Sequence, residues 1–270
     1  MDVSEPTAEQ LQTRTANCKT HGDFESRAIT LPTLGNKPGK PAKVIWSKCP
    51  ACARETAERE ATAKRTEQEQ ARQQRIEDRL NRAGIPKRFR ECSFENYVAD
   101  SDAKRHALST AREFAENFPE HARRGSTLVF AGNVGTGKVH LAMSIAQHII
   151  GQGHSAFFAT AREIVLMLRA RWDDRTAPSE LEVLRMLTKV SLLVIDEIGI
   201  QFNTDAERDQ LFGVIDGRYR ELMPTIVTAN LSRKALQQTI GERSYSRLRE
   251  EGNWVPFDWE DFRGQKRIGR

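Results

Sequence analysis

The stretch that decides the fold is Leu128–Leu141, which reads LVFAGNVGTGKVHL. Its first four residues form a short apolar run, which predicts a buried strand. A glycine-rich loop that ends at Lys138 follows at once, and residues 140–150 repeat apolar side chains at helical spacing. In this order, loop amides, the helix N-terminus and the lysine can all face phosphate oxygens. We therefore predict a nucleotide site, the alternative being a plain glycine turn.

The residues predicted to contact the nucleotide are consecutive in the chain. They are Gly132, Asn133, Val134, Gly135, Thr136, Gly137, Lys138, Val139 and His140. A Ser or Thr normally follows the lysine and binds Mg²⁺ through its hydroxyl, but Val139 offers no oxygen. We expect nucleotide binding to survive and hydrolysis to be slow or weakly Mg-dependent. The alternative is that a water molecule fills the ligand position and little changes.

Composition sets the class of protein. The chain has 270 residues, enough for one substantial domain and a small one, with 38% hydrophobic and 29% charged residues. The net charge of +5 permits an anionic partner such as nucleic acid. No apolar run approaches the ~18–20 residues of a membrane span, and the N-terminus has no apolar signal core. We expect a cytoplasmic protein with no membrane partner, whose four cysteines are reduced or metal-bound.

Two short motifs near the N-terminus have the spacing of metal ligands. Cys18 and His21 form a CxxH pair, and Cys49 and Cys52 form a CxxC pair. Each pair lets a tight turn direct two ligands at one tetrahedral ion, so we predict Zn²⁺ in a ribbon of a few short strands. The alternative is reduced thiols and a surface histidine in a flexible tail. Cys92 lies far away beside an apolar residue and is expected to be a small buried side chain.

A very polar segment follows the second pair. Residues 54–82 are mostly Ala, Glu, Gln and Arg, with Glu–Arg and Glu–Lys pairs four residues apart, which predicts a solvated helix. It serves as a spacer between domains or, alternatively, as an arm that docks on a partner. We predict a zinc-binding domain over 1–53, a charged helical linker over 54–84 and the main domain over 85–270.

The main domain alternates helical and strand patterns. This alternation predicts an α/β fold with a parallel sheet and flanking helices. The expected helices lie at 103–118, from 161 onward, at 180–189 and at 208–220. The expected strands lie at 156–159, 192–195, 225–230 and 254–259, with a loop at 119–126.

Polar residues at two strand ends are candidates for chemistry. Asp196 and Glu197 end a strand of four apolar residues, where α/β sheets place their ligands. Asp196 can hold Mg²⁺ directly or through water, and Glu197 can orient and deprotonate a water for attack on a γ-phosphate. Asn230 is the last residue of another expected strand and can reach the same phosphate. The alternatives are an ordinary strand end and a turn-forming asparagine.

Five motifs in order resemble those of one family. GNVGTGKVHLA, LLVIDEIG, TAN, GERSYSRLR and FDWEDFR resemble bacterial replicative-helicase loaders of the DnaC/DnaI type, which are AAA+ P-loop ATPases. The resemblance covers roughly residues 85–263. The N-terminal pairs resemble the helicase-binding domain of the DnaI-like branch in ligand pattern only. Transposition helper ATPases of the IstB type share most of these motifs and are the nearest competitor.

The resemblance implies roles for single residues. Lys138 and its loop would bind the triphosphate, Asp196 and Glu197 would be the Walker B pair, and Asn230 would be sensor 1. Arg247 would be an arginine finger that reaches the ATP of a neighbouring subunit, with Arg243 as the alternative. Arg263 would be sensor 2. Each arginine could instead be a surface charge.

The resemblance also implies partners and an activity. We expect an ATP-dependent loader that binds the hexameric replicative helicase of the DnaB type through its zinc module and self-associates into a ring or spiral. It would hold single-stranded DNA, with Arg169 and Trp172 as candidate contacts, although Trp172 could equally be a core residue. The alternatives are an IstB-like transposition helper and a non-enzymatic nucleotide-dependent scaffold, the latter motivated by Val139.

Overall fold

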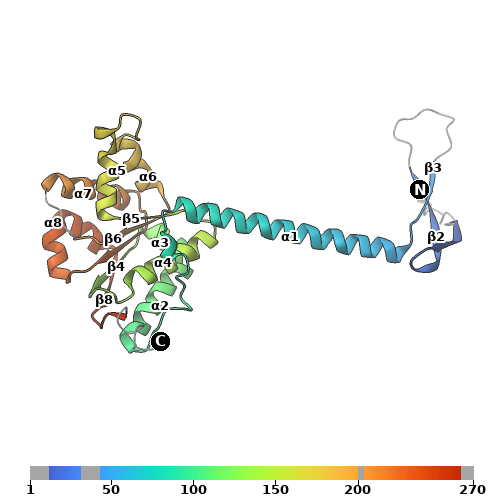
Figure 1. Ribbon diagram of the computed structural model, residues 1–270, viewed down its shortest axis with the longest axis horizontal. Coiled ribbons are helices and arrows are strands. Elements are labelled where there is room, and N and C mark those ends of the chain that lie inside the picture. Colours follow the sequence, from blue (N-terminus) through green and yellow to red (C-terminus); the bar gives the residue numbers. More distant parts are fainter. Residues whose placement is uncertain (1–11, 32–42, 200–203, 263–270) are drawn as a thin grey trace, which may run out of the picture. The chain divides into compact units, whose positions relative to one another are not determined.

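The computed structural model describes residues 12–31, 43–199 and 204–262 (Figure 1). The chain divides into two compact units, residues 1–73 and 74–270. The division predicted from the sequence, with boundaries at 53 and 84, stays a prediction.

The first unit contains a small antiparallel sheet. Its strands β1 (Thr13–Cys18), β2 (Gly22–Leu31) and β3 (Lys43–Trp46) pair in the order β1-β2-β3. The polar helix α1 (Pro50–Arg82) follows. It begins four residues earlier than expected, because a proline is well tolerated at the first position of a helix. Cys52 therefore lies in the first turn of α1, which matters for the metal cluster described below.

The second unit is built on a parallel sheet of five strands. These are β4 (Thr127–Gly132), β5 (Ala156–Thr160), β6 (Leu192–Asp196), β7 (Thr225–Ala229) and β8 (Gly252–Phe257), in the order β5-β6-β7-β4-β8. Every pairing between them is parallel, so their carboxyl ends lie along one edge. The predicted parallel sheet is confirmed.

Helices cover both faces of this sheet (Figure 1). The helices are α2 (Asp102–Glu116), α3 (Phe118–Arg124) and α4 (Lys138–Gly151) on one side, and α5 (Ala161–Asp173), α6 (Glu180–Lys189), α7 (Asp205–Arg220) and α8 (Arg233–Glu250) on the other. Side chains of β4 alternate between the two cores. Leu128 and Phe130 pack with α2 and α4, whereas Val129 packs with α5 and α7. Burial on both faces explains the continuous apolar runs of the strands.

Two local expectations were wrong. The segment expected as a loop over 119–126 contains α3, because Pro119 occupies an early position of the helix and Gly125 ends it in the left-handed conformation. The final strand begins and ends two residues earlier than expected. Thr160 and Glu163 form a capping box at the start of α5. None of the described helices is apolar enough over a sufficient length to cross a membrane.

Candidate functional site

The predicted nucleotide residues meet at the carboxyl edge of the parallel sheet. The phosphate loop follows β4, the two acids lie at the end of β6, and Asn230 follows β7, which lies between those strands. They surround a cavity of about 490 Å³. Its lining comprises Arg88, Phe89, Cys92, Asn96, Val134, Gly135, Thr136, Gly137, Lys138, Val139, His140, Asp196, Glu197, Asn230 and Phe262.

Two glycines give the phosphate loop its path. Gly132 has φ of 138°, and a Cβ there would lie 2.5 Å from the carbonyl oxygen of Phe257. Gly137 has φ of 96° immediately before α4, and a Cβ would lie 2.7 Å from the ring of Tyr97. Only glycine fits both the conformation and the space at these positions. The loop thus leads directly into the N-terminus of α4, as an anion site requires.

Lys138 is nearly fully buried at the start of α4, with an exposed fraction of 5%. Its ammonium donates to the carbonyl oxygen of Gly132 at 3.0 Å and also to that of Asn133, and lies 3.5 Å from the Thr136 hydroxyl. The loop itself therefore holds the charge beside the cavity.

Asp196 is a buried carboxylate held by two donors. Its Oδ1 accepts from the hydroxyl of Thr228 and, at 2.9 Å, from the amide of Glu197. Burial raises the pKa of Asp196 above its ordinary value, while the Thr228 hydroxyl, the Glu197 amide and the charge of Lys138 oppose that rise. The carboxylate is therefore partly desolvated and oriented, as a residue that binds a cation needs to be.

Glu197 has an unusual backbone conformation. Its φ is 55°, a left-handed value that is uncommon for a residue other than glycine. The next amide, that of Ile198, donates to the carbonyl oxygen of Thr228 at 3.0 Å, which fixes the turn. The Glu197 side chain is exposed at the cavity, and Asn230 lies beside it, half-buried. Strained residues of this kind concentrate at functional sites.

The residues present fit a magnesium ion only in part. Asp196 supplies a carboxylate oxygen, the kind of ligand that Mg²⁺ prefers. Val139 is half-buried and packs against the core, so its side chain contributes no ligand. A metal at this site would be held by Asp196, by the nucleotide and by water.

One wall of the cavity was not predicted from the sequence. Arg88, Phe89, Cys92 and Asn96 line it. Gln147 of α4 holds this segment in place by donating to the carbonyl oxygens of Phe89 at 3.0 Å and Cys92 at 2.8 Å. The basic and aromatic composition of residues 86–97 was the only signal in the sequence. Cys92 itself is half-buried, and burial raises the pKa of its thiol.

The arginine predicted to act as a finger lies elsewhere. Arg247 and Arg243 are absent from the described lining of the cavity. Arg247 bonds to Asp216 of α7 at 3.1 Å and covers the ring of Tyr219, with its Cζ 4.4 Å from the centroid. Arg243 lies 4.2 Å over the ring of Phe212. Arg247 thus joins α8 to α7 and is not among the described residues that line its own chain's cavity.

Of the remaining predicted contacts, Arg169 is the one whose side chain the structure describes. Arg169 donates to Glu207 at 3.1 Å and to Gln210 at 3.0 Å, so it ties α5 to α7. The side chain of Trp172 and all of Arg263 lie outside the described part of the chain. The roles of these three residues stay predictions.

The four predicted zinc ligands form one cluster in the first unit. The ligand atoms of Cys18, His21, Cys49 and Cys52 all lie within 4.8 Å of one another. The Sγ atoms of Cys18 and Cys52 are 3.4 Å apart, and His21 Nδ1 lies 3.3 to 3.8 Å from the three sulfurs. Ligands placed tetrahedrally around Zn²⁺ are roughly 3.7 Å apart, so this donor set fits a structural zinc ion.

A carboxylate outside the cluster fixes the histidine. His21 Nε2 lies 3.0 Å from Oε1 of Glu55 on α1, which leaves Nδ1 directed at the sulfurs. A carboxylate on the second ring nitrogen is the usual support of a metal-bound histidine. The backbone amides of Thr20 and His21 lower the pKa of Cys18 to about 6, so its thiolate is available at neutral pH.

Comparison with known proteins agrees with the geometry of the nucleotide site. Residues 57–248 match the family described as IstB-like ATP binding protein. The chain belongs to this family of AAA+ ATPases. The match includes the phosphate loop, both acids of β6 and Arg247.

Relatives of this IstB-like protein include helicase loaders. The Escherichia coli K12 protein YdaV is 36% identical over 195 residues, covering 72% of this chain and 77% of YdaV. The replicative helicase loader DnaC of the same strain is 32% identical over 195 residues, covering 72% and 78%. The crystal structure of the DnaC helicase loader superposes with a TM-score of 0.58 at 25% identity, covering 64% of this chain and 100% of that one. The crystal structure of DnaI gives a TM-score of 0.56 at 20% identity, covering 66% and 93%, which shows the shared fold.

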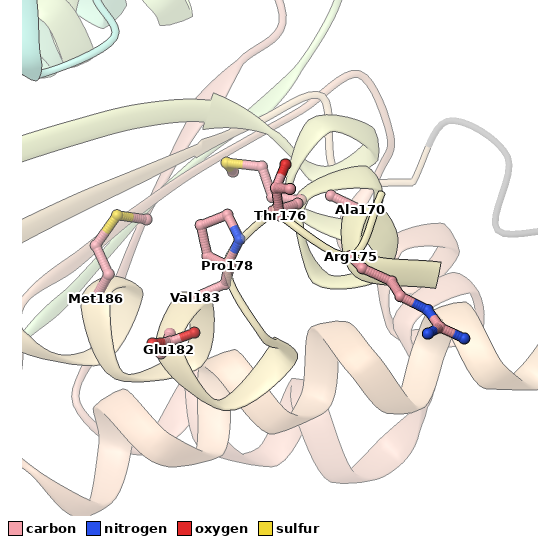
Figure 2. A pocket seen from close by; sticks show the side chains of 9 residues that line it. Ala170, Arg175, Thr176, Pro178, Glu182, Val183 and Met186 are labelled. Carbon is pink, nitrogen blue, oxygen red and sulfur yellow. The ribbon is translucent and has the colours of Figure 1, made fainter. Parts of the chain in front are cut away.

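This family member has a second cavity, of about 700 Å³, at the ends of α5 and α6 (Figure 2). Ala170 lies on α5, Thr176 and Pro178 in the connecting loop, and Val183 and Met186 on α6. The lining is largely apolar and includes none of the residues of the phosphate loop. This groove is therefore separate from the nucleotide cavity.

Proposed function

We propose that this protein is an ATP-dependent loader of the hexameric replicative helicase. The observation that carries the proposal is its similarity to DnaC, at 32% identity over 72% of this chain and 78% of DnaC. The agreement in fold extends over the whole of the crystallised DnaC chain. We place the activity in the cytoplasm, where replicative helicases act.

The cavity supplies the groups needed for ATP hydrolysis. Lys138 and the loop amides hold the triphosphate, and Asp196 holds Mg²⁺ directly or through water. Glu197 orients the attacking water and takes its proton, and Asn230 reaches the γ-phosphate and that water. The burial of Asp196 and the fixed turn at Glu197 support these assignments.

ATP serves as a switch between subunits. Arg247 lies outside its own chain's cavity, which suits a finger that reaches the γ-phosphate of a neighbouring subunit in a ring or spiral. Arg263 contacts the nucleotide within its own subunit. Hydrolysis would release the arginine contact and with it the assembly.

The N-terminal unit binds the helicase. Its Cys3His cluster holds zinc, which supplies much of the folding free energy of so small a unit. The polar helix between residues 54 and 84 acts as a spacer. Single-stranded DNA is held by the assembled ATPase domains, with Arg169 and Trp172 as contacts and the net charge of +5 in support.

Val139 makes ATP hydrolysis slow, because its side chain offers no oxygen to Mg²⁺. A loader acts once for each helicase that it delivers, so slow hydrolysis is compatible with the task. If phosphate release is absent even with DNA and helicase present, the protein is a nucleotide-dependent scaffold instead.

A helicase-loading assay tests the proposal. The purified full-length protein should deliver the helicase onto single-stranded circular DNA in an ATP-dependent manner, and Lys138→Ala should abolish delivery. Delivery that needs neither the protein nor ATP would contradict the proposal.

The second candidate is a transposition helper ATPase, which the IstB-like family description favours. Such a protein would form DNA-wrapped filaments and stimulate a transposase. Copurification with transposase in place of helicase would decide for this alternative.

A further inference from the structure

The residues that follow β8 lie against the phosphate loop. We call residues 257–262 the carboxy-terminal strap. The carbonyl oxygen of Phe257 accepts from the amide of Asn133 at 2.9 Å, and the amide of Phe262 donates to the carbonyl oxygen of Gly135 at 3.1 Å. The indole Nε1 of Trp259 donates to the carbonyl oxygen of Thr136 at 2.9 Å. The strap therefore holds three backbone groups of the loop through hydrogen bonds, at Asn133, Gly135 and Thr136.

These bonds determine how two peptide planes are turned. In a planar trans peptide, the C=O of one residue and the N–H of the next point in opposite directions. The carbonyl groups of Gly135 and Thr136 face the strap, so the amides of Thr136 and Gly137 face away from it. Neither amide donates a hydrogen bond to any group in the described part of the chain. Both residues line the nucleotide cavity, where such amides can bind phosphate oxygens.

Trp259 is itself fixed to the core. Its ring packs on that of Phe257 with centroids 4.7 Å apart, and the fully buried Phe257 meets Phe130 of β4 edge-on at 5.1 Å. The side-chain amide of Asn133 adds a second link by donating to the carbonyl oxygen of Trp259 at 3.3 Å. The indole donor is therefore held in place before any ligand arrives.

We propose that Trp259 is a positioning residue for phosphate binding: through its indole N–H it turns the Thr136–Gly137 peptide so that the Gly137 amide faces the phosphates. The inference rests on the nucleotide-binding role of the cavity and deepens it. Because the amides are oriented in advance, binding requires less ordering of the loop. Trp259 touches no phosphate and acts only through the loop.

Calorimetric titration of the full-length protein with ATP, ADP and adenosine tests the proposal. Trp259→Phe keeps an aromatic ring on Phe257 but removes the indole donor. Trp254→Phe is the matched control, because it makes the same chemical change in β8, where the indole packs against Tyr245 away from the loop. Asn133→Ala is a second variant, which removes the side-chain link to the strap and leaves the backbone in place.

We expect Trp259→Phe to weaken binding of ATP and ADP about 3- to 10-fold, the effect of one hydrogen bond, with binding of adenosine unchanged. Asn133→Ala should also weaken binding of ATP and ADP, but by a smaller factor. Trp254→Phe should bind ATP, ADP and adenosine like the wild type. An equal loss of adenosine binding would show general damage to the cavity and overturn the inference, as would an unchanged ATP affinity in Trp259→Phe. Absence of ATP binding by the wild type would overturn the nucleotide-binding role itself.

Discussion

Arg247 on α8 donates from Nε to Oδ1 of Asp216 on α7 at 3.1 Å, and Asp216 Oδ2 accepts from Arg220 at 3.0 Å. The Asp216 side chain is only 17% exposed, and the ring of Tyr219 covers one face of the Arg247 guanidinium. The bond through Nε to a carboxylate of α7 fixes the direction of the guanidinium. This arrangement suits an arginine that is held ready for the nucleotide of a neighbouring subunit.

Mixing two inactive variants tests this arrangement. Asp216→Asn removes the charge that orients Arg247, and Lys138→Ala removes the chain's own nucleotide site. Each should lose most ATPase activity alone, with a loss of roughly 10-fold or more, and a mixture should recover part of it, because one variant supplies an intact finger and the other an intact site. Asp209→Asn, on an exposed position of α7, is the control and should stay active. Failure of the mixture to recover activity would show that Asp216 acts within its own subunit.

Asp196→Asn should lower the ATPase activity and raise the thermal stability. The asparagine oxygen can still accept from Thr228 and the Glu197 amide, but no charge is buried. We expect loss of Mg²⁺-dependent hydrolysis by about 100-fold or more, together with a higher Tm at neutral pH.

The higher Tm expected for Asp196→Asn should depend on pH, because the pKa of Asp196 is raised in the folded protein. The folded state holds the proton at pH values where the unfolded state has lost it, so wild-type stability falls as pH rises through this range. The difference in Tm between variant and wild type should therefore be largest at neutral pH and vanish below the ordinary carboxyl pKa. A lower Tm for the variant at pH 7 would contradict this account.

Glu55→Ala should weaken metal binding at the Cys3His cluster. Loss of a carboxylate that orients a histidine ligand typically costs about 10- to 100-fold in affinity. Competition with a chromophoric chelator measures the zinc affinity, and Co²⁺ absorption reports the ligand set. Glu58→Ala, one turn further along α1 and exposed, is the control. Equal affinities for the two variants would show that Glu55 is a surface residue only.

Val139→Thr tests whether the missing hydroxyl limits hydrolysis. Threonine has nearly the shape of valine and adds the oxygen that usually binds Mg²⁺. We expect ATPase activity to rise by about 10-fold at limiting Mg²⁺, with ATP affinity little changed. An unchanged Mg²⁺ dependence would indicate that water already fills this position.

Much of the nucleotide site could be predicted from local patterns. The glycine-rich loop between a strand and a helix, and two acids after an apolar run, are short motifs whose geometry is set by nearby residues. The alternation of helices and strands predicted the parallel sheet, and parallel strands bring Asp196 and Asn230 to the same edge as the loop. The spacing within the cysteine and histidine pairs likewise predicted the cluster.

Contacts between distant segments could not be predicted in this way. The strap approaches the loop from more than a hundred positions along the chain, and the bond from Trp259 to Thr136 has no local signature. The wall formed by residues 88–96 is held by Gln147 and His140, two polar residues of α4 whose partners lie about fifty positions away in the chain. Helix α3 lies in a segment that was predicted as a loop, and its Pro119 lies at an early helix position, where proline is tolerated.

The most direct test of the proposed function is the native mass of the full-length protein mixed with the host's hexameric replicative helicase in the presence of ATP, for the wild type and for Cys49→Ser. We predict a stable complex with the wild type, lost in the variant because the zinc module no longer folds. Absence of any complex with the wild type, under conditions where it binds ATP, would contradict the loader proposal and favour the transposition-type ATPase.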